Sequence, residues 1–134
     1  MSTRRQVAEV RASLPATPES VARARALLGE LLDDADVDWT RRRAGLLVAS
    51  ELVTNAIRHG SADGDEVGIV YEIKGSRLCI CVSDAARGSS VPVQLSTDEQ
   101  RLTGRGLQLV AQLADWSERI VNGRREVRAE ILLF

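Results

Sequence analysis

Polar side chains recur at helical spacing within residues 46–57, a segment that is otherwise almost entirely apolar. Glu51 and Asn55 lie four residues apart, and Arg58 follows seven residues after Glu51. On a helix these side chains form one narrow stripe, with His59 at its edge. A buried carboxylate or amide costs free energy unless it has a partner. The stripe therefore either borders a water-filled pocket, or it caps the core or pairs with arginines, and the spacing alone favours neither interpretation.

A second candidate is Asp84, at the end of a segment in which apolar and more polar residues alternate. Leu78, Ile80 and Val82 share one face of the expected strand, so the same parity directs Asp84 toward the core and the helices. A carboxylate in that position can accept a hydrogen bond from an amino group of a ligand. The alternative interpretation is an aspartate that initiates a turn.

The third candidate is Gly104-Arg105-Gly106, where a long loop over residues 85–103 meets an expected helix. Glycines let the backbone approach a ligand closely, and a helix N-terminus offers N–H groups to a phosphate. The same pattern also occurs as a flexible hinge. Together the three candidates describe a pocket with an acidic acceptor at one end and an anion site at the other. Asn55 could bring a hard cation to the phosphates there.

The remaining periodicity predicts the elements that position these residues. Strands are expected over 6–14, 67–73, 78–82, 116–121 and 125–134, and helices over 19–32, 39–58 and from 104 or 106 to about 114. Gly75-Ser76 and Asn122-Gly123 are turn signals for two hairpins. At 134 residues the chain is too short for two independent cores, so we expect one domain over residues 1–134. Because helices and strands do not alternate strictly, we expect its fold class to be an α/β (α+β) two-layer sandwich, with a mixed, mostly antiparallel sheet and three helices on one face.

Composition excludes several functional classes. A net charge of -1 lacks the basic footprint of a DNA-binding protein, and 3% aromatic residues argue against base stacking. No apolar run approaches a membrane span, and the N-terminus lacks the apolar segment of a secretory signal, so we expect a cytoplasmic protein. Cys79 and Cys81, with a single histidine in the chain, cannot build a four-ligand zinc site without several carboxylates. We interpret them as two small side chains on one strand face.

The segment Glu51-Leu52-Val53-Thr54-Asn55-Ala56-Ile57-Arg58-His59-Gly60 resembles the N-box of the Bergerat-fold ATPases, which include gyrase B, histidine kinases and mismatch-repair ATPases. Its form, E-x-V-T-N-A-I-x-H-G, is most similar to the bacterial anti-sigma-factor serine/threonine kinases. Val82-Ser83-Asp84 resembles the start of their D-x-G-x-G box, and Gly104-Arg105-Gly106-Leu107 resembles the glycine box after the ATP lid. The order and spacing agree, and the resemblance covers roughly residues 18 to 134.

The resemblance implies the Bergerat ATP-binding fold and a role for each polar residue of the motifs. Asn55 would hold Mg²⁺ against the phosphates of ATP or ADP, and Asp84 would accept the adenine amino group. Glu51 would be catalytic, as the general base that accepts the proton of a substrate serine. His59 belongs to the N-box and is interpreted as a residue at the edge of the pocket.

The glycines of the motifs would serve the nucleotide as well. Gly88 matches the second glycine of the D-x-G-x-G box, and residues 85–103 would form the lid. By the same resemblance, Gly104, Arg105 and Gly106 would bind the phosphates. Arg87 and Arg101 are the cations of this lid, and each is either a phosphate contact or a solvated side chain.

The function that the resemblance implies is an ATP-binding anti-sigma-factor regulator. Such a protein would phosphorylate a serine on an antagonist protein and sequester a sigma factor, without direct contact to nucleic acid or membrane. Dimerisation is common in this class. Ala86 stands where the D-x-G-x-G box has its first glycine. This departure favours a second interpretation, a non-catalytic nucleotide-binding interaction module, and a third is a domain that has lost ATP binding.

Overall fold

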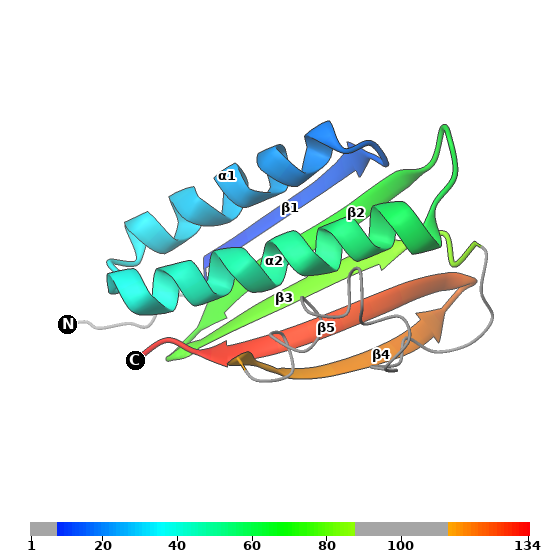
Figure 1. The fold of residues 1–134 in the computed structure, drawn as a ribbon. Coiled ribbons are helices and arrows are strands. Elements are labelled where there is room, and N and C mark those ends of the chain that lie inside the picture. Colours follow the sequence, from blue (N-terminus) through cyan, green and yellow to red (C-terminus); the bar gives the residue numbers. More distant parts are fainter. Residues whose placement is uncertain (1–7, 88–112) are drawn as a thin grey trace.

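The computed structural model describes residues 8–87 and 113–134 (Figure 1). In chain order the elements are β1 (Ala8–Pro15), α1 (Glu19–Asp34), α2 (Trp39–Gly60), β2 (Glu66–Lys74), β3 (Arg77–Asp84), β4 (Asp115–Val121) and β5 (Arg124–Leu132). All five expected strands and the first two expected helices are present. Nearly all of the expected third helix lies outside the described residues, as do Gly88, Gly104, Arg105 and Gly106.

The five strands form one sheet in the order β1-β2-β3-β5-β4. All four pairings are antiparallel, so the parallel component of the expected mixed sheet is not found among the described strands. The turns give the physical reason for two of these pairings, because short hairpins join only antiparallel neighbours. Positive φ angles at Gly75, Asn122 and Gly123 supply the tight turns that the sequence predicts.

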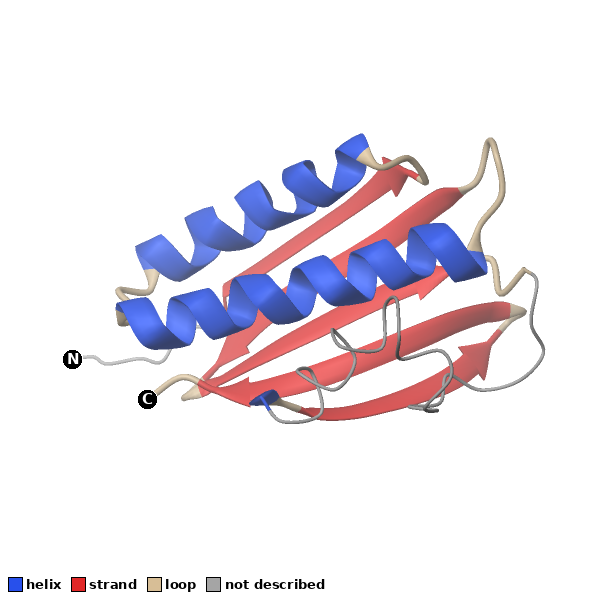
Figure 2. Cartoon of the chain, viewed as in Figure 1, coloured by secondary structure: helices blue, strands red, loops and turns tan. Residues whose placement is uncertain are grey.

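Both described helices lie side by side on one face of the sheet (Figures 1 and 2). Alternate residues of β2 and β3 are buried on that face, and the residues between them are partly exposed on the other. The core is aliphatic apart from Tyr71, whose hydroxyl donates a hydrogen bond to the carbonyl of Ala24 in α1 at 3.0 Å. The described part is therefore an α+β fold with two helices on a five-stranded antiparallel sheet.

Helix α2 is the element that carries the polar stripe. It begins after Asp38, whose side chain accepts a hydrogen bond from the N–H of Arg41 at 2.9 Å and so caps the helix. The helix packs on β2, β3 and β5, and it ends at Gly60, next to the end of β3 (Figure 1). This packing brings the end of α2 to Asp84.

Candidate functional site

The polar stripe lies on the C-terminal half of α2 and is not sealed in the core. Glu51 and Asn55 are half-buried, whereas Arg58 and His59 are exposed. Neither Glu51 nor Asn55 hydrogen-bonds to another side chain in the described part of the chain, so the pairing with arginines that the sequence left open is not found there. Burial raises the pKa of the Glu51 carboxyl above its ordinary value, and the Arg58 guanidinium opposes that shift.

The Asp84 carboxylate is buried at the end of β3, with 3% of its surface exposed, as strand parity predicts. Its Oδ1 accepts hydrogen bonds from the N–H of Ala86 at 2.7 Å and from Nε of Arg125 at 3.4 Å. The first of these bonds is a turn-initiating contact, so Asp84 both faces the core and starts a turn. Gly60 of α2 lies directly against this carboxylate, where an added Cβ would overlap its atoms. The predicted acceptor is therefore fixed at the end of the helix that carries the polar stripe.

Arg125 of β5 is a site residue that the sequence reasoning missed. It pairs with Asp84 across two antiparallel strands, and 5% of its side chain is exposed. Its Nη1 lies 3.7 Å from Oε2 of Glu118 on β4, and 7% of the Glu118 side chain is exposed. Two carboxylates and one guanidinium thus form a buried cluster. The signal that could have found it is the alternation of β5, in which Arg125 has the parity of the buried apolar residues.

The residues after Asp84 are anchored to the loop that follows α2. The N–H of Arg87 donates to the carbonyl of Gly60 at 3.1 Å. Its guanidinium donates two hydrogen bonds to the Asp65 carboxylate, from Nε at 2.6 Å and from Nη2 at 3.0 Å. These Arg87 bonds, together with the N–H of Ala62, lower the pKa of the Asp65 carboxyl. Arg87, expected to be a solvated cation or a phosphate contact, therefore has an internal partner.

The geometry of α2 sets the order in which the predicted site residues lie along the helix. At about 1.5 Å per residue, Asn55 lies about 7 Å and Glu51 about 13 Å back along α2 from Gly60, which contacts Asp84. A nucleotide laid along α2 with its base at Asp84 would extend its phosphates toward Asn55 and then Glu51. The cleft that the three side chains would share stays a prediction, as do the phosphate contacts of the glycine boxes.

Metal-binding groups are sparse around this site. Within residues 8–87 and 113–134, no group of three or more His, Cys, Asp and Glu side chains could hold a metal ion. A single amide oxygen from Asn55 fits Mg²⁺ nevertheless, because that ion is usually held by one or two protein ligands together with phosphates and waters. Cys79 and Cys81 are half-buried on one face of β3, as expected, and burial raises the pKa of both thiols. No described helix is long and apolar enough to cross a membrane.

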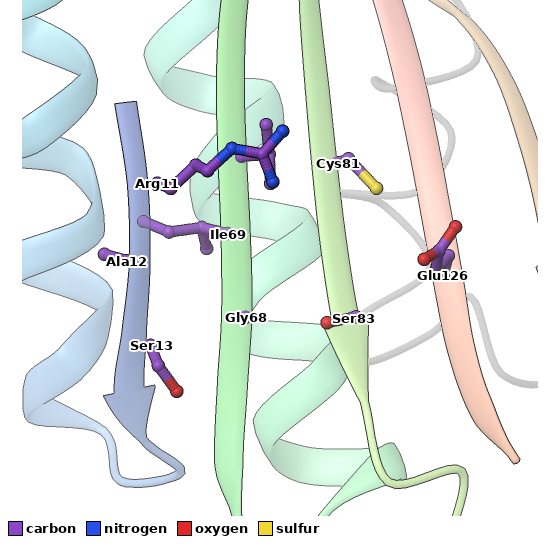
Figure 3. A pocket seen from close by; sticks show the side chains of 9 residues that line it. Arg11, Ala12, Ser13, Gly68, Ile69, Cys81, Ser83 and Glu126 are labelled. Carbon is purple, nitrogen blue, oxygen red and sulfur yellow. The ribbon is translucent and has the colours of Figure 1, made fainter. Parts of the chain in front are cut away.

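A shallow hollow of about 380 Å³ lies on the other face of the sheet, away from the helices (Figure 3). Side chains that line it include Arg11, Ser13, Cys81, Ser83 and Glu126. It depends on Gly68, because a Cβ there would come within 2.6 Å of Oγ of Ser83. The hollow shares no residue with the predicted site.

A methyl group at Gly60 tests the contact between α2 and Asp84. We expect Gly60→Ala to lower the free energy of unfolding by about 1–3 kcal/mol, because the new Cβ would overlap a carboxylate that two donors hold in place. Gly45→Ala in the same helix is the control. Its Cβ would meet movable Cδ atoms of Leu78 at 3.2 Å and Leu32 at 3.3 Å, so the loss should be smaller. Urea denaturation measures the free energy of unfolding of both variants. Equal losses in Gly60→Ala and Gly45→Ala would contradict the predicted overlap.

Ala86 has a φ of 60°, in the left-handed region that costs a residue with a Cβ about 1–2 kcal/mol. We expect Ala86→Gly to raise the free energy of unfolding by about 1 kcal/mol. Ala85→Gly, at a position without a positive φ, should lower it by about 0.4–1 kcal/mol because glycine gives the unfolded chain more freedom. Thermal or urea unfolding compares the two variants, and a loss of stability in both would show that Ala86 is unstrained.

Residues 14–131 match the protein family described as histidine kinase-like ATPase domain. No curated protein matches the chain.

Two solved structures resemble the chain. The first contains the RsbU and RsbW domains of Rv1364c from Mycobacterium tuberculosis, with 21% identity and a TM-score of 0.65. That likeness covers 94% of this chain and 32% of the other, so this chain spans about a third of the length of the chain that it matches. The second is the Acinetobacter baumannii histidine kinase AdeS, with 17% identity, a TM-score of 0.48, and coverage of 92% of this chain and 68% of the other. The first likeness shows a shared fold.

Proposed function

This chain belongs to the histidine kinase-like ATPase domain family, and from that membership we propose that it is an ATP-binding regulator of the anti-sigma-factor type. It transfers a phosphoryl group from ATP to a serine of an antagonist protein, and it sequesters a sigma factor. The observation that carries the proposal is the placement of a buried carboxylate, Asp84, against the end of the helix whose stripe holds Glu51 and Asn55. The E-x-V-T-N-A-I-x-H-G form of that helix supports the anti-sigma class.

Two residues orient the nucleotide in this proposal. Asp84 accepts a hydrogen bond from the adenine amino group. In the described part of the chain both donors to this carboxylate act on Oδ1, which leaves Oδ2 for a ligand. The amide oxygen of Asn55 would hold Mg²⁺, and this ion would supply neutralisation of the phosphate charge. Gly88 and the Gly104-Arg105-Gly106 segment are proposed to complete the phosphate site.

Glu51 is the proposed general base. The serine oxygen forms a bond to the γ-phosphorus while the bond from that phosphorus to the bridging oxygen breaks, and ADP leaves. The hydroxyl proton passes to the Glu51 carboxylate, which also orients the serine. Burial raises the pKa of Glu51, and this supports the role because it increases the proton affinity of the carboxylate.

Arg58 should set the pH at which the transfer begins. Glu51 accepts a proton only in its ionised form, and its pKa is raised, so the rate should climb with pH through that raised value. The Arg58 charge lowers the same pKa, so Arg58→Gln should move the acid limb of the rate profile to higher pH. Transfer rates measured from acid to neutral pH check this, with the exposed Arg23→Gln as the control. A shift to lower pH, or an equal shift in the control, would contradict the assignment.

The alternative is a non-catalytic nucleotide-binding interaction module of the same fold. Ala86 favours this alternative, because its methyl group stands where the D-x-G-x-G box has its first glycine. That position is two residues after Asp84, the proposed acceptor of the adenine amino group. A module of this kind would bind nucleotide and change its affinity for a partner without transferring phosphate.

A transfer assay separates the two functions. The protein is incubated with γ-labelled ATP, Mg²⁺ and serine-bearing antagonist candidates encoded in the same genome, and label is located by mass spectrometry. Label on a serine of an antagonist is the expected result. Nucleotide binding without transfer to any candidate supports the module, and absence of nucleotide binding contradicts both. Co-purification with sigma factors of the same genome, with and without ATP, tests the sequestering role.

A further inference from the structure

The buried guanidinium of Arg125 has a donor that no described residue accepts. Its Nε donates to Oδ1 of Asp84 at 3.4 Å, and its Nη1 lies 3.7 Å from Oε2 of Glu118. Its Nη2 is buried and has no hydrogen-bond partner within residues 8–87 and 113–134. Buried polar groups in folded proteins are nearly always hydrogen-bonded, so this donor calls for a partner.

The planar shape of the guanidinium fixes where that partner would sit. The N–H of Nε and one N–H of Nη2 point in parallel along one edge, the edge that grips pairs of acceptors. Because Nε on this edge faces Oδ1 of Asp84, the free Nη2 hydrogen is directed to the space beside the same carboxylate. The buried pair therefore presents an acceptor and a donor side by side.

We propose that Arg125 is a base-reading residue, whose Nη2 donates a hydrogen bond to N1 of adenine while Asp84 accepts from the adenine amino group. This inference rests on the proposed function, which places the nucleotide base at Asp84. The amino group and N1 are neighbours on the Watson–Crick edge of adenine, so one donor and one acceptor meet the complementary pair on the protein. Arg125 would thus contact the base directly, in addition to pairing with Asp84.

The same pair would reject guanine in this orientation. Guanine carries a carbonyl where adenine has its amino group, and an N–H where adenine has the N1 acceptor. The carbonyl would face the Asp84 carboxylate and the N–H would face the Arg125 donor, and both contacts are repulsive. A purely structural ion pair makes no such distinction between bases.

The test is a calorimetric titration of the whole chain with ADP and with 1-deaza-ADP, in which a C–H replaces N1 and the amino group is kept. We expect the wild type to bind 1-deaza-ADP about tenfold more weakly, a difference of about 1.4 kcal/mol. In Arg125→Lys, which keeps the charge but loses the paired donors, the two affinities should become similar. Arg124→Lys is the matched control, since Arg124 contacts Ser83 and the carbonyl of Glu66 instead, and it should keep the tenfold ratio.

The outcomes separate this inference from the proposed function. Equal affinities for ADP and 1-deaza-ADP in the wild type overturn the N1 contact while nucleotide binding stands. A tenfold ratio that survives in folded Arg125→Lys assigns the contact to another group and also overturns it. If that variant does not fold, the wild-type ratio decides, together with a GDP titration that should show binding weaker than that of ADP. A folded wild type that binds no nucleotide overturns the proposed function and this inference together.

Discussion

Replacing Glu51 with glutamine is expected to slow phosphoryl transfer to the antagonist serine by about 10²–10⁴-fold, the usual contribution of a positioned general base. The amide has nearly the same shape as the carboxylate but cannot take the hydroxyl proton. Affinity for ADP should be nearly unchanged, because Glu51 lies about 13 Å along α2 from the residue that contacts Asp84. Single-turnover transfer and an ADP titration on the same preparation measure the two effects separately.

Glu30→Gln is the matched control for that prediction. Glu30 is an exposed carboxylate on α1, so the same change of side chain should leave transfer and binding as they are. A parallel loss of transfer and of ADP affinity in Glu51→Gln would assign Glu51 to binding. Unchanged transfer would remove it from the chemistry altogether.

Removing the guanidinium of Arg125 should have the largest effect on stability. Arg125→Leu leaves Asp84 and Glu118 buried without the cation between them, and breaking a buried ion pair from one side costs about 3–5 kcal/mol. Arg128→Leu is the control on the same strand. Its side chain is 49% exposed and pairs with Glu130 at 3.6 Å, so its loss should cost about 1 kcal/mol or less.

Urea denaturation of both variants measures the difference. A similar small loss in each variant would show that burying Asp84 and Glu118 without Arg125 costs little free energy of unfolding. A large loss in Arg125→Leu alone would confirm that β3, β4 and β5 are held together at this end by the buried cluster.

Local patterns in the sequence predict most of the described fold. Alternation marks β2 and β3, because one face of each strand is buried and the other is not. Gly75 and Asn122-Gly123 mark the hairpins because their positive φ angles suit tight turns. The all-antiparallel pairing of the described strands was not predicted. Strand order depends on how distant segments meet, and in this sheet β5 lies between β3 and β4.

The same distinction between local and distant contacts explains which candidate site residues were found. Glu51 and Asn55 follow from helical spacing, and the inward direction of Asp84 follows from strand parity. The alternation of β5 could have marked Arg125 as buried, but its partner Asp84 lies 41 residues away, across a pairing that no local pattern reveals. Gly60 could be recognised as a helix end, but its contact with Asp84 depends on how α2 crosses the sheet.

The most direct test of the account is a calorimetric titration of ADP with Mg²⁺ into the wild type and into Asp84→Asn. The account predicts that the wild type binds ADP and that the isosteric variant, shown by its thermal transition to be folded, binds about tenfold or more weakly. That loss is the size expected for one hydrogen bond to a charged acceptor. Asp63→Asn, at an exposed aspartate in the loop after α2, should bind like the wild type. Equal ADP affinity in all three proteins would contradict the placement of the base at Asp84.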